Sequence, residues 1–230
     1  MQPGSIVEEV TRNGFTIIPS VFTTTESENV AKLISGSSLS RGRAGIRHVL
    51  ANPDVAAVAR SPQLAEIASA ILGGGATPFC ATFFDKSPTS NWLVAWHQDT
   101  ALPLRAKHDL PGWGPWSVKD GIAYAHAPTS ALTKVVALRV HLDDSTEMNG
   151  PLRVLPGTHD SGILSDDEVH DLSLRMPSVD CSVPRGGILA MRPLLIHSSS
   201  KSQVEAARRV LHIEYAASLK ISPGVELAIA

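Results

Sequence analysis

A change of pattern at Thr77 most constrains the fold of this chain. Beyond it, short runs rich in β-branched and aromatic residues alternate with Pro, Gly, Asn and Asp, which is the pattern of strands joined by turns. The runs span residues 79–85, 92–97, 135–142, 152–155, 188–191 and 210–215. Many short strands with frequent turns are typical of a sandwich or a barrel. We therefore predict a mostly β core over residues 76–220.

The first 75 residues carry helical patterns and one early strand. Asn52-Pro53 and Ser61-Pro62 each place a capping residue before a proline at the first helical position, and Gly73 follows the second helical pattern. The apolar segment Phe15–Ile18 has the composition of a strand. We expect a helix-rich flank over residues 1–75.

The length and the charge of the chain limit its expected domain number, binding partners and location. A chain of 230 residues suits one domain over residues 1–230 with a substantial core. Its 20 basic and 22 acidic residues form no basic block, which argues against a nucleic-acid partner. No apolar run approaches the roughly 18 residues of a membrane span, and no secretory signal is recognisable, so we expect no membrane partner and a cytoplasmic location. Cys80 and Cys181 are predicted to be small buried residues.

His97 and Asp99 follow an apolar run, residues 91–96, that we interpret as a buried strand. Residues two apart on a strand point to the same side, so the imidazole and the carboxylate can face one point. A His-x-Asp spacing alone is also common on solvent-facing strands. Two histidines and one carboxylate are the ligands of non-heme iron(II) oxygenases, so a further histidine would complete such a site.

His197 is the candidate for that further histidine. It follows the apolar run Leu194-Leu195-Ile196 and lies one hundred residues after His97. The two histidines can meet only in a fold that brings distant strands together. A double-stranded β-helix, the jelly-roll barrel of cupins, does this. Considered alone, His197 is more typical of a core or surface histidine.

Arg208 and Arg209 open the apolar run at residues 210–215. The planar guanidinium fork of an arginine suits a carboxylate, so one of the two arginines can anchor a dicarboxylate inside the barrel. Strand alternation does not choose between them. An exposed ion pair with Glu205 or Glu214, worth little, is the alternative.

Two Gly/Pro-rich stretches, residues 108–121 and 143–162, are candidates for functional loops. The first carries Trp113 and Trp116, and we interpret it as part of a pocket mouth. Equally, these two side chains can pin the loop to the core. Candidate pocket residues are Trp92, His108, Trp113, His126 and His212.

Several motifs follow one another along the chain: Phe84-Asp85-Lys86, Asn91-Trp92, Trp96-His97-Gln98-Asp99, Leu138-Arg139-Val140-His141-Leu142-Asp143-Asp144, Asn149-Gly150-Pro151-Leu152-Arg153-Val154 and Pro156-Gly157-Thr158-His159. In this order and spacing they resemble the phytanoyl-CoA dioxygenase family of Fe(II)- and 2-oxoglutarate-dependent oxygenases. Residues 13–18 resemble the family's N-terminal strand. The resemblance therefore covers nearly the whole chain.

The resemblance implies a role for each matching residue. His97, Asp99 and His197 would bind iron, and Arg208, eleven residues after His197, would anchor the far carboxylate of 2-oxoglutarate. Ser199 would lie near the cosubstrate. Gln98 and Trp116 are further candidates for the lining of the site.

The implied activity is a dioxygenase reaction that uses O2 and 2-oxoglutarate and releases succinate and CO2. Because Asp99 fills a position that related halogenases leave to chloride, hydroxylation is the expected outcome. The chain has no basic cluster for the phosphates of coenzyme A, which favours a small metabolite or natural-product intermediate as substrate. The alternatives are a cupin-like metal enzyme independent of 2-oxoglutarate and a non-catalytic small-molecule-binding barrel.

Overall fold

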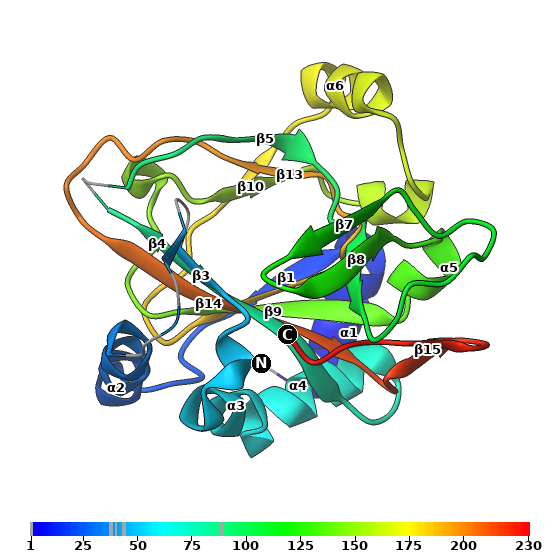
Figure 1. The fold of residues 1–230 in the computed structure, drawn as a ribbon. Helices are drawn as coiled ribbons and strands as arrows, with labels where there is room; N and C mark the ends of the chain where they lie inside the picture. The colour runs from blue at the N-terminus through cyan, green and yellow to red at the C-terminus, as the bar shows by residue number, and fades with distance from the viewer. Residues whose placement is uncertain (1, 37–38, 40, 43–44, 88–89) are drawn as a thin grey trace.

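Two facing antiparallel sheets dominate the structure, which is a computed structural model describing residues 2–36, 39, 41–42, 45–87 and 90–230. The described residues form a seven-stranded sheet ordered β1-β12-β9-β14-β4-β3-β2 and a four-stranded sheet ordered β11-β10-β13-β5. Figure 1 shows the small sheet lying above the large one. This is the double-sheet arrangement of a jelly-roll barrel, and the predicted mostly β fold is confirmed.

Each run predicted from the sequence contains a strand, but the structure also has strands that the sequence pattern did not predict. The large sheet contains β1 (Phe15–Ile18), β12 (Ile188–Met191), β9 (Val135–His141), β14 (Arg208–Ala216), β4 (Thr77–Lys86), β3 (Gly45–Arg47) and β2 (Arg41–Gly42). The small sheet contains β11 (Val179–Cys181), β10 (Leu152–Val154), β13 (His197–Ser199) and β5 (Val94–His97). A third sheet, ordered β6-β8-β7, contains β6 (Ala101–Leu104), β8 (Ile122–His126) and β7 (Trp116–Lys119). The hairpin β15–β16 comprises Lys220–Ser222 and Val225–Glu226.

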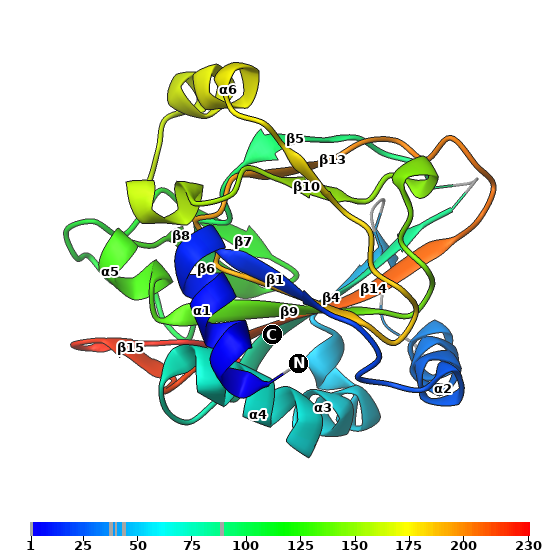
Figure 2. The ribbon, with the colours of Figure 1, turned by 180° about the vertical axis from the view of Figure 1, so that it is seen from behind.

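Helices α1 (Pro3–Asn13), α2 (Thr24–Ser35), α3 (Pro53–Ala59) and α4 (Pro62–Leu72) lie on the outer face of the large sheet (Figure 1 and Figure 2). By contrast, α6 (Asp166–Arg175) contacts β5 of the small sheet, and α5 (Thr129–Leu132) packs against β6 and β8. The 3₁₀ turns are η1 (Val49–Ala51), η2 (Glu147–Asn149) and η3 (Thr158–Ser161). Figure 1 places α3 and α4 beneath the sheet, and Figure 2, from behind, shows α1 against β1. Among the described residues, no helix combines the length and the apolar character needed to cross a membrane.

The two helices with predicted proline starts, α3 and α4, begin where expected, but the Ser61 side chain makes no capping hydrogen bond to α4. The Asn52 side chain accepts hydrogen bonds from the backbone N–H groups of Asp54 and Val55, which caps α3. Gly73 ends α4 in the left-handed conformation, which a residue without Cβ adopts at little cost. These local signals fix the helices on which the large sheet packs.

Two sequence interpretations need correction. Residues 91–96 were interpreted as a buried strand, but β5 begins at Val94, lies at the edge of the small sheet and leaves Leu93 62% exposed. None of the four residues of this edge strand is buried, because a strand with one paired neighbour is less completely covered than a strand inside the sheet. The stretch 108–121 was interpreted as a loop, but its end forms β7, which pairs with β8. Cys80 and Cys181 are buried free thiols, as predicted.

Candidate metal centre and cosubstrate site

His97, Asp99 and His197 converge between the two sheets. His97 and His197 are direct partners in the β5–β13 pairing, and Asp99 follows β5 by two residues. The Nε2 atoms of His97 and His197 each lie 3.5 Å from a different Asp99 carboxylate oxygen. One ligand atom from each residue lies within 4.8 Å of the others. This is the spacing of three ligands around one metal ion.

Backbone carbonyls fix both histidine rings. His97 Nδ1 lies 2.8 Å from the Ala95 carbonyl oxygen, and His197 Nδ1 lies 2.9 Å from that of Leu195. A carbonyl oxygen accepts a hydrogen bond, so each Nδ1 carries the proton and each Nε2 lone pair faces Asp99. A metal-binding histidine needs the same second contact to hold its ring. The donor set therefore fits a divalent metal ion.

Charge in this cluster favours metal binding as well. Burial lowers the pKa of His197 to about 4, which leaves its ring neutral near pH 7. Removal of Asp99 from bulk solvent raises its pKa, but His197 and His97 outweigh this effect and hold the pKa well below the ordinary range. Burial lowers the pKa of His97, but its contacts with Asp99 and the Ala95 carbonyl outweigh this effect and raise it, so a metal ion at this place would compete with a proton on His97. The neutral ring of His197 and the ionised carboxylate of Asp99 are already in the forms that bind metal.

A second cluster lies along β13 from His197, where Lys86 and Arg208 are paired residues of β4 and β14. Both are buried, and both donate to the Ser199 hydroxyl oxygen, Lys86 Nζ at 2.9 Å and Arg208 Nη2 at 3.4 Å. Arg208 Nε also donates to the Asn149 carbonyl oxygen. Among the described residues, no carboxylate forms an ion pair with either cation. Two adjacent buried cations without an acid suit an anionic ligand.

Unsatisfied polar atoms border this cationic cluster. Arg208 Nη1 and both ring nitrogens of His141 are buried without a hydrogen-bond partner. Burial, followed by the charges of Arg139 and Arg208, lowers the pKa of His141, so its ring is neutral. Buried donors without partners cost stability, and an oxygen-rich ligand would satisfy them. The residues present therefore fit a carboxylate at this place.

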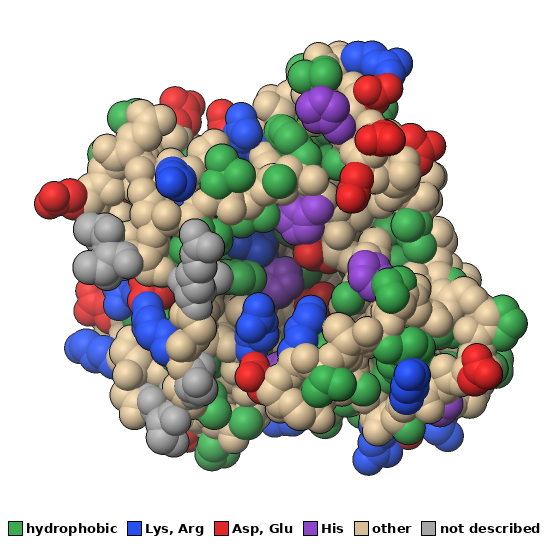
Figure 3. Space-filling model, turned by 45° about the horizontal axis from the view of Figure 1, so that its top comes forward, with side chains coloured by type: hydrophobic (Ala, Val, Ile, Leu, Met, Phe, Trp, Pro, Cys, Tyr) green, Lys and Arg blue, Asp and Glu red, His purple; other side chains and the backbone are tan. Residues whose placement is uncertain are grey.

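The metal-ligand candidates line a cavity of about 520 Å³. Figure 3 shows a hollow in this face, with histidine, lysine and arginine side chains around it. Three of the predicted pocket residues, Trp92, His126 and His212, line the cavity, whereas His108 and Trp113 do not. Arg208 and Ser199 are also not among its lining residues; Leu152, the β10 partner of Ser199, lines the cavity beside them.

Gln98 and Trp116 lie in different surroundings. The Gln98 side chain donates to the Gly162 and Leu194 carbonyl oxygens and accepts from the Leu164 N–H, so it ties β5 to two loops. It also borders the cavity. Trp116 lies on β7 and packs against an apolar cluster that includes Leu102 and Leu104, not among the residues that line the cavity. Its role near the cosubstrate stays a prediction.

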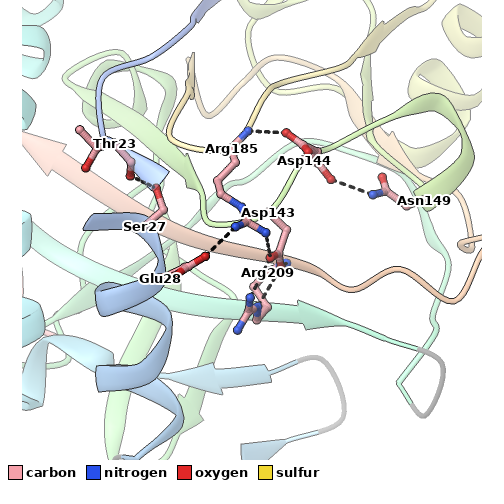
Figure 4. Close-up of polar contacts among 8 residues, drawn as sticks. All are labelled: Thr23, Ser27, Glu28, Asp143, Asp144, Asn149, Arg185 and Arg209. Atoms are coloured by element: carbon pink, nitrogen blue, oxygen red, sulfur yellow. Dashed lines mark hydrogen bonds and ion pairs between the residues drawn. The ribbon is translucent and has the colours of Figure 1, made fainter. Parts of the chain in front are cut away.

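An ion-pair network holds the loop behind Arg208. Arg209 donates from Nε and Nη2 to the Asp143 carboxylate at 2.8 and 2.7 Å, and Arg185 connects Asp143 to Glu28 of α2 (Figure 4). The next residue, Asp144, accepts from the Arg185 backbone N–H. Together these contacts fix the start of the loop that carries Asn149 to Arg208.

Strand alternation separates the two arginines that sequence could not tell apart. Arg208 faces the barrel interior and Ser199, whereas Arg209 faces the Asp143 network. The sequence motifs contain Arg139 and Lys86, but neither residue was assigned a role from the sequence. Their signal was available in the strand period, since Arg139 and His141 share a face of β9, as do Lys86 and Phe84 on β4.

The class of protein with this architecture is a jelly-roll barrel that holds two histidines and one carboxylate in position to bind a metal ion. The chain belongs to the phytanoyl-CoA dioxygenase (PhyH) family, whose model matches residues 10–210.

One curated relative and two solved structures illustrate the similarity. The chain is 28% identical over 186 residues to an L-proline trans-4-hydroxylase from Streptomyces griseoviridis, a match that covers 70% of this chain and 62% of the hydroxylase. EctD from S. alaskensis, solved with 2-oxoglutarate and 5-hydroxyectoine, superposes with a TM-score of 0.70 at 18% identity, over 92% of this chain and 74% of that one. The epimerase SnoN, in complex with Fe3+, alpha ketoglutarate and nogalamycin RO, gives 0.70 at 16%, over 94% and 84%. The two structures establish the shared fold.

Proposed function

We propose that the protein is a non-heme Fe(II)- and 2-oxoglutarate-dependent dioxygenase that hydroxylates a small organic molecule and releases succinate and CO2. The observation that carries the proposal is the convergence of His97 Nε2, His197 Nε2 and the Asp99 carboxylate, with both histidine tautomers fixed for metal binding. Family membership and the L-proline trans-4-hydroxylase relative support it.

In this proposal His97, Asp99 and His197 hold iron, and Arg208 holds the far carboxylate of 2-oxoglutarate with Ser199 and Lys86. The two buried cations and their unsatisfied neighbour His141 support that assignment. Iron(II) and 2-oxoglutarate, when bound, supply the oxidation itself, in which O2 gives one oxygen atom to the substrate and one to the succinate formed as CO2 is lost. The chain supplies the ligand geometry and a shaped cavity.

A cavity of about 520 Å³ supports a small substrate in preference to a complete acyl-CoA. The cytoplasmic location and the absence of nucleic-acid and membrane partners stay predictions.

The test is an anaerobic titration of metal-free protein with Fe(II) and then 2-oxoglutarate, following the visible charge-transfer band of their chelate. The wild type should give a band that saturates. Arg208→Ala should raise the 2-oxoglutarate Kd about tenfold or more, because a charge-assisted pair is lost. Arg175→Ala is the matched control, since Arg175 is an exposed residue of α6 paired with Asp171.

Each alternative function predicts a different result. Iron binding without a 2-oxoglutarate band would favour a metal enzyme independent of 2-oxoglutarate. Protein that binds no iron at all would favour a non-catalytic barrel. Equal 2-oxoglutarate affinity in Arg208→Ala and Arg175→Ala would show that Arg208 does not bind the cosubstrate. The assignment of the metal site would be unaffected.

A further inference from the structure

Arg139 is a buried cation in the wall of the cavity that holds the metal-ligand candidates. It lies in the middle of β9, a strand buried along its whole length between β12 and β14. Arg139 is 7% exposed, and it is one of the residues that line the cavity. Arg208, at the start of β14, does not line the cavity, although burial, followed by the charge of the nearby Arg139, lowers the pKa of Arg208.

The contacts of Arg139 leave its charge unbalanced. Arg139 Nη1 lies 3.0 Å from His212 Nδ1, and the guanidinium lies over the Phe84 ring at 5.3 Å. Arg139 Nε is buried without a hydrogen-bond partner. In the part of the chain that the structure describes, no carboxylate forms an ion pair with it. Burial lowers the pKa of Arg139 to about 10, so the group stays charged at neutral pH.

His212 and Thr82 lie beside Arg139 on neighbouring strands of the large sheet and add polar groups to the cavity lining. Arg139, His212 and Thr82 are successive partners on β9, β14 and β4, and all three line the cavity. Because His212 Nδ1 accepts from Arg139, the His212 proton lies on Nε2, which is a donor. One row of the large sheet therefore presents a guanidinium, an imidazole N–H and a hydroxyl to the cavity.

The other charges of the cavity do not balance Arg139. Arg47 and Lys119 add positive charge to the lining. The acids are Asp99 and Glu214, and burial, followed by the charge of Asp99, raises the pKa of Glu214 to about 8. In the proposed function the charge of Asp99 is taken up by the metal ion. A cavity with this excess of positive charge favours an anion.

We propose that Arg139, with His212 and Thr82, forms a carboxylate-binding site beside the metal centre, and that the molecule oxidised by this protein carries a carboxylate. The assignment deepens the proposed function and rests on it. The same chemistry has two possible sources, the carboxylate of the substrate and the near carboxylate of 2-oxoglutarate, and the experiment separates them.

The probes are acetate and its neutral analogue acetamide, added to enzyme loaded with Mn(II) and saturated with 2-oxoglutarate. Paramagnetic broadening of the methyl proton signal reports binding near the metal. Acetate should be broadened and acetamide should not. In Arg139→Met the acetate Kd should rise about tenfold or more, because the charged hydrogen-bond donor is lost. The 2-oxoglutarate Kd is measured in parallel through the iron chelate band.

Thermal unfolding of the metal-free protein distinguishes a binding role from a structural one. A buried cation without an acid costs stability, so Arg139→Met should melt at the wild-type temperature or above it. An arginine that merely holds His212 and Phe84 in place would lower that temperature when replaced. Arg139→Gln keeps a donor toward His212 and serves if the methionine variant does not fold.

The acetate and 2-oxoglutarate affinities of the variant, taken together, identify the ligand of the site. Loss of acetate binding with an unchanged 2-oxoglutarate Kd assigns the site to the substrate. A weakened 2-oxoglutarate Kd without an acetate effect assigns it to the near carboxylate of 2-oxoglutarate and overturns the substrate assignment. If a folded neutral variant leaves both affinities as in the wild type, there is no carboxylate site. A wild type without an iron and 2-oxoglutarate band instead contradicts the proposed function, whereas the acetate comparison still tests Arg139.

Discussion

The metal-ligand candidates differ in their exposure to solvent. The His197 side chain is 4% exposed, whereas those of His97 and Asp99 are 39% and 36% exposed. His197 comes from the inner strand β13, and His97 and Asp99 come from the edge strand β5 and the residues after it. The site therefore has a buried side and an open side.

Asp99 is the carboxylate of the metal-ligand set, and its loss should abolish function. Asp99→Ala should bind far less iron and form no succinate, because two neutral imidazoles remain without the charged ligand. Metal analysis and succinate quantification check this. Asp171→Ala on the exposed face of α6 is the control. Full turnover in Asp99→Ala would refute the ligand assignment.

Lys86 gives the proposed cosubstrate site a pH dependence. Burial, followed by the charges of Arg208 and Arg139, lowers the pKa of Lys86 to about 7. A carboxylate binds the charged form, so 2-oxoglutarate affinity should be full below pH 7 and weaken as the pH rises above it. Lys86→Met should show weak binding and a flatter profile between pH 6 and about 8.5. A wild-type profile in the variant would exclude Lys86 from the site.

Residue identities in the sequence were sufficient for the metal-ligand candidates but insufficient for their surroundings. The spacing of His97 and Asp99 predicted a shared side, and the structure places them with His197. The strand period indicates which face Arg139 and Lys86 share with their neighbours along the strand, but not which residues of other strands lie opposite them, so their role was missed. Their isolation from acids depends on strand pairing across more than 50 residues.

At the scale of elements, the Asp143 network joins the segment after β9 to β14 and α2, around the loop that reaches Arg208. Burial alone would raise the pKa of Asp143, but hydrogen bonds from Arg209 outweigh it, and the pKa is lowered. A carboxyl whose pKa is lowered in the folded state stabilises the fold above its unfolded pKa and loses this contribution as the pH falls.

Arg209→Ala should therefore destabilise the fold by about 2 kcal/mol near pH 7, because the buried Asp143 loses its main donors. The difference from wild type should shrink below about pH 4, where Asp143 becomes protonated in the unfolded chain and in the variant while the folded wild type still keeps it ionised. Urea unfolding at pH 7 and at pH 3.5 measures both values. An equal difference at the two pH values would show that charge pairing with Asp143 is not the cause.

Strands β7 and β8 were missed although the sequence holds their signal. Asp120 and Gly121 both have positive φ and form the two-residue turn between them. Asp-Gly is a strong hairpin signal. It was overlooked because residues 108–121 are rich in Gly and Pro, and because β7 leaves Ser117 and Val118 exposed instead of alternating regularly.

At the scale of the whole molecule, the helical flank and the barrel share one core. Val10 of α1, Val55 of α3 and Leu64 of α4 belong to the same buried cluster as Leu138 and Ile213 of the large sheet. Helix and sheet therefore bury each other's apolar faces, as the layers of a single domain do.

We accordingly predict that residues 1–230 unfold as one cooperative unit. Calorimetry should give one transition whose van't Hoff and calorimetric enthalpies agree. A chain starting at residue 76 should fail to fold, because it would expose the face that α3 and α4 cover. Two separate transitions would instead divide the flank from the barrel.

The unequal burial of the metal-ligand candidates also has a consequence for how a bound metal ion would be retained. An ion held by His197 at the back and by His97 and Asp99 at the front would exchange through the mouth of the cavity. A molecule bound in that mouth would block the path of a chelator to the ion. Bound cosubstrate and substrate would therefore also slow the loss of iron, so that iron would dissociate more slowly from the ligand-bound protein than from the ligand-free protein.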